Sequence, residues 1–295
     1  MVRKQRRTST WALVVWGLVV LAAGLGVGFL LGNRGCGRRE APARTAPSRE
    51  GPTHPLPGAH PRAARPAGHP APSLPKLALV IDDLGYMPPE LVTRLCSLPI
   101  PLTVAVLPYQ EYSRESAEIA HRMGKQVMLH LPMEPIGYPA PGRDPGPNAI
   151  LYNLPEAEVR RRVRMALEAV PFRAGVNNHM GSRITPDRTR MTWVLQEIKA
   201  SHCFFVDSRT EKDSVAYAVA EQLGVPAVQR KVFLDDDKSF AAESQQWDRA
   251  LALARKDGSV LMIGHIYPET VGALEKLVPR AEGQVQFVTA GELAH

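Results

Sequence analysis

From residue 76 onward, short runs of apolar residues alternate with longer segments whose apolar residues recur with a helical period. Runs of about four to eight residues rich in Val, Ile, Leu or Phe are typical of buried strands, and the longer pattern is typical of amphipathic helices. The predicted strands cover 77–81, 103–107, 126–131, 174–177, 203–206, 227–233, 259–263 and 286–288. The predicted helices between them cover 111–123, 156–170, 189–200, 215–223, 247–256 and 269–277.

Strands that alternate with helices in this way form a parallel sheet, because each helix carries the chain back to the same end of the sheet. The segment 156–170 illustrates a covering helix: Val159, Val163 and Leu167 form an apolar stripe, and the arginines between them mostly face water. Seven or eight such units favour a closed or nearly closed barrel over an open sheet. We therefore predict one α/β barrel domain of parallel strands over 76–295.

The first 75 residues follow neither pattern. The 21 residues of 11–31 are all apolar or glycine, and as a helix they would span roughly 31 Å, enough to cross the core of a bilayer. A cleavable signal has a shorter apolar core, so we predict a transmembrane helix at 11–31 after a basic cytoplasmic tail at 1–10. Residues 32–75 are dominated by Pro, Ala, Arg and Gly, so we predict a disordered linker there.

The net charge of +7 does not indicate a domain that binds nucleic acid. Glu40 and Glu50 are the only acids in the first 75 residues, and the whole basic excess lies in that segment. We therefore expect no nucleic-acid partner. Because no Gly-rich phosphate-binding motif follows the first predicted strand, we expect no nucleotide partner either. The three cysteines have unrelated spacings and predict neither a disulfide framework nor a thiolate zinc site.

Polar residues stand where most of the predicted strands end. In parallel α/β folds ligands meet the carboxyl ends of the strands, so these residues should share one mouth of the barrel. The set comprises Asp82, Asp83, His130, Asn177, Asn178, His179, Asp207, the aspartates at 235–237 and His265. A single Asp after a strand is more often a helix cap, but three histidines and several aspartates at one mouth indicate a chemical site.

These side chains suit a divalent metal ion and a hydrolytic reaction. The adjacent carboxylates of Asp82 and Asp83 oppose each other's ionisation unless a cation intervenes. Carboxylate oxygen combined with the imidazole nitrogens of His130 and His179 is a ligand set for zinc or a similar divalent ion. An ion with an open position polarises an acyl carbonyl, while the aspartate that is not a ligand could serve as base and His265 as acid.

Five segments in this order resemble the polysaccharide deacetylases of the NodB-like type, and specifically their divergent branch. They are 81–85 (IDDLG), 130–135 (HLPMEP), 177–183 (NNHMGSR), 207–210 (DSRT) and 264–268 (GHIYP). The resemblance covers most of 76–295 and implies an irregular (β/α)7-type barrel with a mononuclear metal. It also implies that Asp82 is the catalytic base, Asp83 a metal ligand and His265 the catalytic acid.

The chain departs from the family pattern at two motifs. Typical members place a second metal-binding histidine four residues after the first, and that position is Glu134 here; their Arg-x-Pro-Tyr segment is replaced by 177–183. Because His130 and His179 close neighbouring strands, we predict His179 as the third metal ligand. An ion held by Asp83 and two neutral histidines keeps a net positive charge that Glu134 would cancel, so we expect Glu134 to support the ligands as a hydrogen-bond acceptor.

The resemblance implies removal of acetyl groups from a cell-envelope polysaccharide. For this function we assign substrate binding or ligand support to Glu134, Asn178, Arg183, Asp207 and Arg209. A glycan-directed domain belongs outside the cytoplasm, so we expect a single-pass protein of the bacterial inner membrane with a periplasmic barrel. Two alternatives stay open: an envelope protein without activity that binds glycan or a partner at the mouth, and a glycosidase that uses Asp82 and Asp207 as its carboxylate pair.

Overall fold

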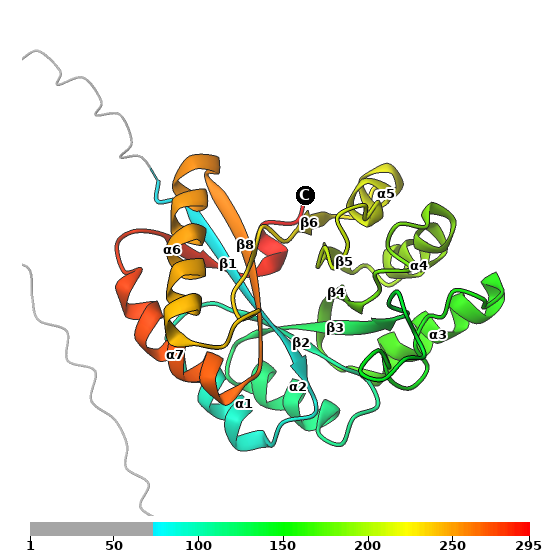
Figure 1. Ribbon diagram of the computed structural model, residues 1–295, viewed down its shortest axis with the longest axis horizontal. Coiled ribbons are helices and arrows are strands. Elements are labelled where there is room, and N and C mark those ends of the chain that lie inside the picture. Colours follow the sequence, from blue (N-terminus) through cyan, green and yellow to red (C-terminus); the bar gives the residue numbers. More distant parts are fainter. Residues whose placement is uncertain (1–72) are drawn as a thin grey trace, which may run out of the picture. The chain divides into compact units, whose positions relative to one another are not determined.

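The computed structural model describes residues 73–295, where strands and helices alternate along the chain (Figure 1). The predicted tail at 1–10, the predicted transmembrane helix at 11–31 and the linker residues up to 72 lie outside this range. Among the helices of 73–295, none is both long enough and apolar enough to cross a membrane.

The strands are β1 Lys76–Leu84, β2 Thr103–Val106, β3 Gln126–Met133, β4 Arg173–Met180, β5 Phe204–Asp207, β6 Ala227–Gln229, β7 Val232–Phe233, β8 Ser259–His265 and β9 Gln286–Val288. The helices are α1 Pro89–Cys96, α2 Ser113–Arg122, α3 Glu156–Ala169, α4 Arg188–Ala200, α5 Ala216–Leu223, α6 Phe240–Asp257 and α7 Pro268–Arg280, followed by a short 3-10 helix at Ala290–Glu292.

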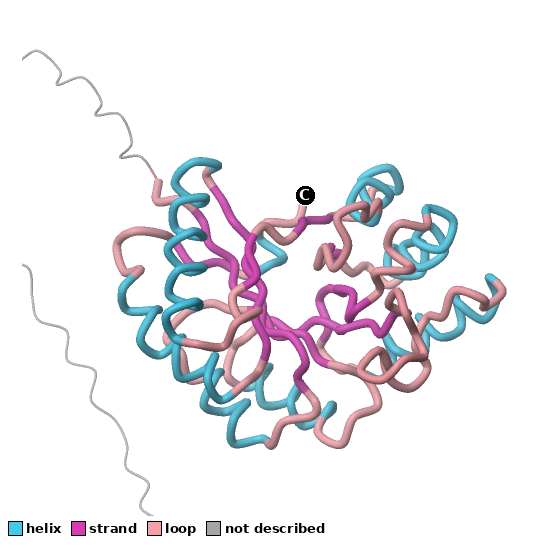
Figure 2. Tube along the Cα trace, in the orientation of Figure 1, coloured by secondary structure: helices cyan, strands magenta, loops and turns pink. Residues whose placement is uncertain are grey.

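All strands belong to one parallel sheet with the order β6-β5-β4-β3-β2-β1-β8-β7. Along one edge of β1, the first residues pair with β9 and the later residues pair with β2. The sheet curls strongly, and the helices cover its outer side (Figure 2). The predicted parallel α/β architecture is confirmed. Within the described residues no ladder joins β6 to β7, so the sheet is a curled half-barrel that stays open at this seam, whereas a closed or nearly closed barrel was predicted.

Two layers of apolar side chains hold the sheet in place, because successive residues of a strand point to opposite faces. In β1, Leu77, Leu79 and Ile81 belong to the large core between the sheet and the helices. The alternate residues Ala78 and Val80 belong to a smaller core inside the curl. The next inward position on β1 is residue 82, so alternation alone aims a polar side chain into the carboxyl-end mouth.

The structure differs from the predicted elements in several places. Helix α1 and the 3-10 helix at Ala290–Glu292 were not predicted, and α6 begins at Phe240, seven residues before the predicted start. The predicted strand 227–233 is two strands, because its neighbour changes halfway. Arg230 donates its backbone N–H to Asp207 on the β5 side, whereas Lys231 donates to Leu261 of β8. The open seam follows from this change of partner.

Candidate metal centre and active site

Polar side chains from β1, β3, β4 and β8 meet in a pocket at the carboxyl ends of the strands. The pocket has a volume of about 240 Å³. Its lining residues are Asp82, Asp83, His130, Asn178, His179, Met180, Ser208, Thr210, Phe233 and His265. The inward alternation explains several of them, since His130 follows Met128 and His265 follows Ile263, both of which belong to the inner core. The predicted mouth therefore exists and contains the predicted base, acid and metal ligands.

Asp83 reaches this pocket through an irregular backbone. In a regular strand it would point to the face opposite Asp82. Its φ angle is +64°, and the pairing of β1 with β2 shifts register between Ile81 and Leu84. Aspartate is among the few residues other than glycine that occupy this left-handed region with any frequency. The irregularity lets two consecutive carboxylates line one pocket.

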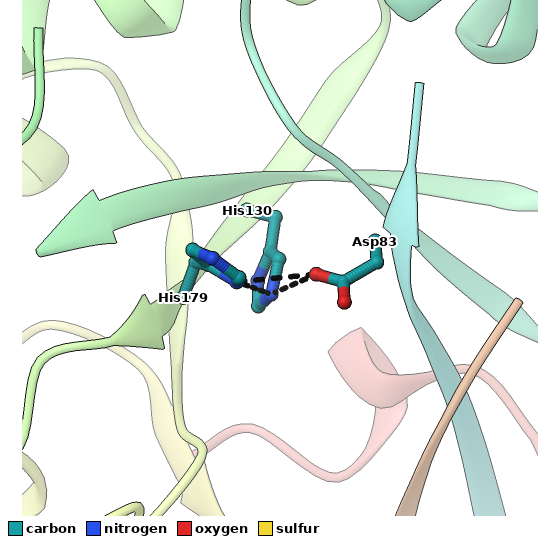
Figure 3. Close-up of side chains that lie close together, drawn as sticks. All are labelled: Asp83, His130 and His179. Atoms are coloured by element: carbon teal, nitrogen blue, oxygen red, sulfur yellow. Dashed lines mark hydrogen bonds and ion pairs between the residues drawn. The ribbon is translucent and has the colours of Figure 1, made fainter. Parts of the chain in front are cut away.

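Asp83, His130 and His179 point toward one another from β1, β3 and β4 (Figure 3). Asp83 Oδ1 lies 3.3 Å from His130 Nε2 and 3.1 Å from His179 Nδ1, and the two nitrogens are 3.1 Å apart. Ligand atoms about 2.0–2.1 Å from a tetrahedral ion lie roughly 3.3 Å from one another, so the three atoms fit the ligand triangle of one metal ion. Asp83 Oδ1 is buried and accepts no well-formed hydrogen bond from residues 73–295, which leaves it available as a ligand.

Asn177 orients two of the central side chains. Its Oδ1 lies 2.8 Å from His130 Nδ1, and its Nδ2 donates to Asp82 Oδ1 over 2.9 Å. An amide oxygen only accepts hydrogen bonds, so His130 carries its proton on Nδ1 and presents the lone pair of Nε2 to Asp83 and His179. This is the tautomer that a metal ligand requires, fixed by its neighbour.

The pKa values of the two adjacent carboxyl groups are shifted in opposite directions. Burial raises the pKa of Asp82, and the charge of Asp83 adds to this although His130, His265 and the Asn177 amide act against it. Burial also acts to raise the pKa of Asp83, but the imidazoles of His130 and His179, 3.3 and 3.1 Å away, hold it well below its usual range. Asp82 is thus the better proton acceptor, and Asp83 stays anionic.

His265 is held by Asp235, which follows β7. His265 Nδ1 lies 3.0 Å from Asp235 Oδ1, and Asp235 Oδ2 accepts the backbone N–H of His265 over 2.6 Å. Burial opposes protonation of the imidazole, but the hydrogen bond and charge of Asp235, with the charges of Asp82 and Asp83, raise the pKa of His265 to about 9. His265 is therefore protonated near neutral pH, and Nε2 is the nitrogen free to meet a ligand in the pocket.

The model of the divergent polysaccharide deacetylases matches residues 79–294, which is nearly the whole described domain. The chain belongs to the divergent polysaccharide deacetylase family. The chain is similar to the uncharacterized protein YibQ of Escherichia coli. The two are 37% identical over 218 residues, which cover 74% of this chain and 67% of YibQ. An uncharacterized Haemophilus influenzae protein is 36% identical over 218 residues, covering 74% of this chain and 76% of that protein.

A solved structure shows the same fold. The crystal structure of the uncharacterized protein ATU2773 from Agrobacterium tumefaciens superposes with a TM-score of 0.71 and 22% sequence identity. The likeness covers 77% of this chain and 92% of that protein. The curled parallel sheet of this chain is therefore an architecture that has also been observed in a crystal.

Within the described residues, Glu134 supports a loop and forms no hydrogen bond with His130 or His179. Its carboxylate accepts the backbone N–H of Tyr152 and the guanidinium of Arg183, each over 2.6 Å. The Arg183 guanidinium also lies over the Tyr152 ring, 4.4 Å from its centroid. The buried acid thus fastens the segment between β3 and α3 to the residues after β4, beside the metal triad.

Of the other residues predicted to bind substrate or support the ligands, one lines the pocket and two do not. Asn178 lines the pocket and accepts the backbone N–H of Ser208 over 2.9 Å. Asp207 and Arg209 do not line it. Asp207 accepts from Ser214 and from the Arg209 backbone, each over 2.8 Å, so it fixes the turn before α5. Arg209 donates to Gln229 of β6 over 2.9 Å.

Three residues that contribute to the site received no role from the sequence: Asn177 and Asp235, which were only placed at the predicted mouth, and Ser208. Alternation along the strands could have identified two of them. Phe204 and Val206 face the inner core, so residue 208 rather than 207 continues that face. His179 faces the pocket, so Asn177 lies on the same face two residues earlier. Asp235 was one of three consecutive aspartates, and no pattern distinguished it from its neighbours.

Proposed function

We propose that this chain is a metal-dependent hydrolase that removes acetyl groups from a cell-envelope polysaccharide. The observation that carries the proposal is the joint presence, in one pocket, of the Asp83–His130–His179 triad with Asp82 and His265. A triad alone could belong to a structural metal. A proton acceptor and a proton donor beside it are what hydrolysis requires in addition.

Metal binding, proton acceptance and proton donation fall to different side chains of the pocket. Asp83, His130 and His179 would hold zinc or a similar divalent ion, whose positive charge polarises the acetyl carbonyl. Asp82, positioned by Asn177, accepts a proton from the attacking water. His265, protonated and held by Asp235, donates a proton to the leaving nitrogen or oxygen of the sugar. Met180 and Phe233 give the pocket an apolar wall beside these polar groups.

The deciding experiment measures acetate released from acetylated peptidoglycan fragments by the purified full-length chain. We expect release that stops after treatment with a chelator and returns on addition of zinc. A chain that binds a stoichiometric ion but releases no acetate from any acetylated envelope glycan would instead be a binding protein that retains the deacetylase fold. Glycosidase activity has less support, because Asp207, its second carboxylate, does not line the pocket.

We also propose that the domain works outside the cytoplasm on a membrane anchor. The support is the apolar segment 11–31 with its basic tail at 1–10, together with a family whose substrates are polysaccharides. The full-length chain should sediment with bacterial inner membranes, and protease added to spheroplasts should digest 76–295. Recovery of a soluble chain that begins near residue 32 would identify the segment as a cleaved signal and contradict the anchor.

A further inference from the structure

A carboxyl group of helix α6 is buried outside the pocket that holds His265. Glu243 lies in the first turn of α6, and its side chain is completely buried. Neither of its oxygens accepts a hydrogen bond from the residues of 73–295. An ionised carboxylate in such a place is strongly disfavoured, because nothing replaces the water it has lost. The acid form of Glu243, which carries a proton that it can donate, suits this position better.

Thr270 connects Glu243 to the pocket. It lies in the first turn of α7, beside Glu243, and donates its hydroxyl proton to Asp235 Oδ2 over 2.9 Å. Its oxygen keeps lone pairs that can accept a hydrogen bond from the carboxylic acid of Glu243. Asp235 in turn holds His265 Nδ1. Helices α6 and α7 pack against each other (Figure 1), and α6 also packs against β8.

The charges around Glu243 do not supply a cationic partner. Burial raises the pKa of Glu243 to about 7; the Thr270 hydroxyl acts in the opposite direction, and the charges of Asp235, Glu269 and Asp237 add to the increase. Glu243 also lines a cavity of about 350 Å³ between α1, α6 and α7, where the other charged residues are Arg94, Lys238, Glu269, Glu275 and Lys276. Arg94 pairs with Glu275, Lys238 lies over the Tyr267 ring and Lys276 over the Phe240 ring.

We propose that Glu243 is a positioning residue for His265 and acts through a hydrogen-bonded chain of side chains. Two links of this chain are present in the structure: Thr270 donates to Asp235, and Asp235 holds His265. The proposed third link is a hydrogen bond that the carboxylic acid of Glu243 donates to Thr270 Oγ1. The chain keeps the Thr270 proton directed at Asp235, and so keeps His265 in its orientation. An ionised Glu243 competes with Asp235 for that proton and weakens the support. The catalytic role of His265 rests on the function proposed above, whereas the chain itself does not.

The test follows the His265 imidazole by NMR while the pH is varied, in the full-length chain with ¹³C-labelled histidine. The wild-type signal should show, besides the titration of His265 itself, a second inflection near pH 7, where Glu243 ionises. Glu243→Gln keeps a neutral N–H donor, so this inflection should vanish while the rest of the titration is retained. Thr270→Val breaks the chain at similar volume and should also remove it. The control Glu269→Gln, at an exposed acid on the same cavity, should leave it in place.

Acetate release gives a second readout. Glu243→Leu should lower the rate about 10-fold, the lower end of the range for partners that act through another residue, and Glu243→Gln should restore it. The proposal is overturned if the inflection near pH 7 persists in Glu243→Gln, or if the wild type never shows it. The inflection could depend on Glu243 while neither the wild type nor any variant releases acetate. In that case the hydrolase function is wrong, and the chain of hydrogen bonds stands.

Discussion

Replacing His179 with alanine should abolish tight binding of a divalent ion to the full-length chain. The His179 Nδ1 atom is one corner of a triangle whose other corners, Asp83 Oδ1 and His130 Nε2, lie 3.1 Å away. Two remaining ligands cannot close the coordination that zinc prefers, so the affinity should fall by more than about 100-fold, beyond the range for outer-shell partners. Competitive titration with a fluorescent zinc chelator measures this change directly.

The matched control is Glu134→Gln, at the position where typical family members have their second histidine. Within the described residues, Glu134 accepts hydrogen bonds from Tyr152 and Arg183 and forms none with His130 or His179. Its replacement should therefore lower the affinity for the ion by only about 10-fold, through the adjoining loop. If the ranking were reversed, with His179→Ala at wild-type affinity and Glu134→Gln without metal, the ligand set would be the usual one with glutamate in place of histidine.

Asp82→Asn and His265→Ala should each lower the rate of acetate release by roughly 10² to 10⁴ while the metal stays bound. Asp82 is the carboxylate whose pKa burial raises, and an amide at this position cannot accept the proton of water. His265 is the group that Asp235 keeps protonated. Steady-state rates measured alongside metal content by atomic absorption separate loss of chemistry from loss of the ion.

Asp83→Ala serves as the opposite control in that series. It should lose the metal, because the Asp83 carboxylate is the anionic member of the triad. Equal loss of metal in Asp82→Asn and Asp83→Ala would show that both carboxylates bind the ion and that neither is reserved for proton transfer.

Much of the fold is readable from the sequence because a parallel sheet covered by helices needs buried strands that are apolar over their whole length. β1 and β8 stand out for this reason, and their pairing places Asp82 opposite His265. The seam between β6 and β7 could not be read in this way. Its cause is the change of backbone partner at Arg230 and Lys231, and a change of partner leaves no trace in hydrophobicity.

The candidate site was predictable as a set of residues but less so in its details. Strand ends identified Asp82, Asp83, His130, His179 and His265, all of which line the pocket. Asp207 was included because it directly follows an apolar run, whereas the strand alternation directs Ser208 inward. Alternation places Asn177 on the face of His179, but its role follows only from its hydrogen bond to His130. Asp235 is one of three consecutive aspartates, and only its hydrogen bonds to His265 distinguish it.

The left-handed backbone at Asp83 limits how this position can vary in evolution. Among residues with a side chain, only Asn, Asp and His occupy such φ angles with any frequency. Asparagine would give up the anionic ligand, and histidine would leave the ion without a compensating negative charge. Any other amino acid with a side chain would add backbone strain of roughly 1–2 kcal/mol and would also lack the carboxylate oxygen of Asp83. If Asp83 holds the ion proposed above, position 83 of this chain therefore tolerates almost no substitution, because the backbone and the ligand role each exclude most amino acids.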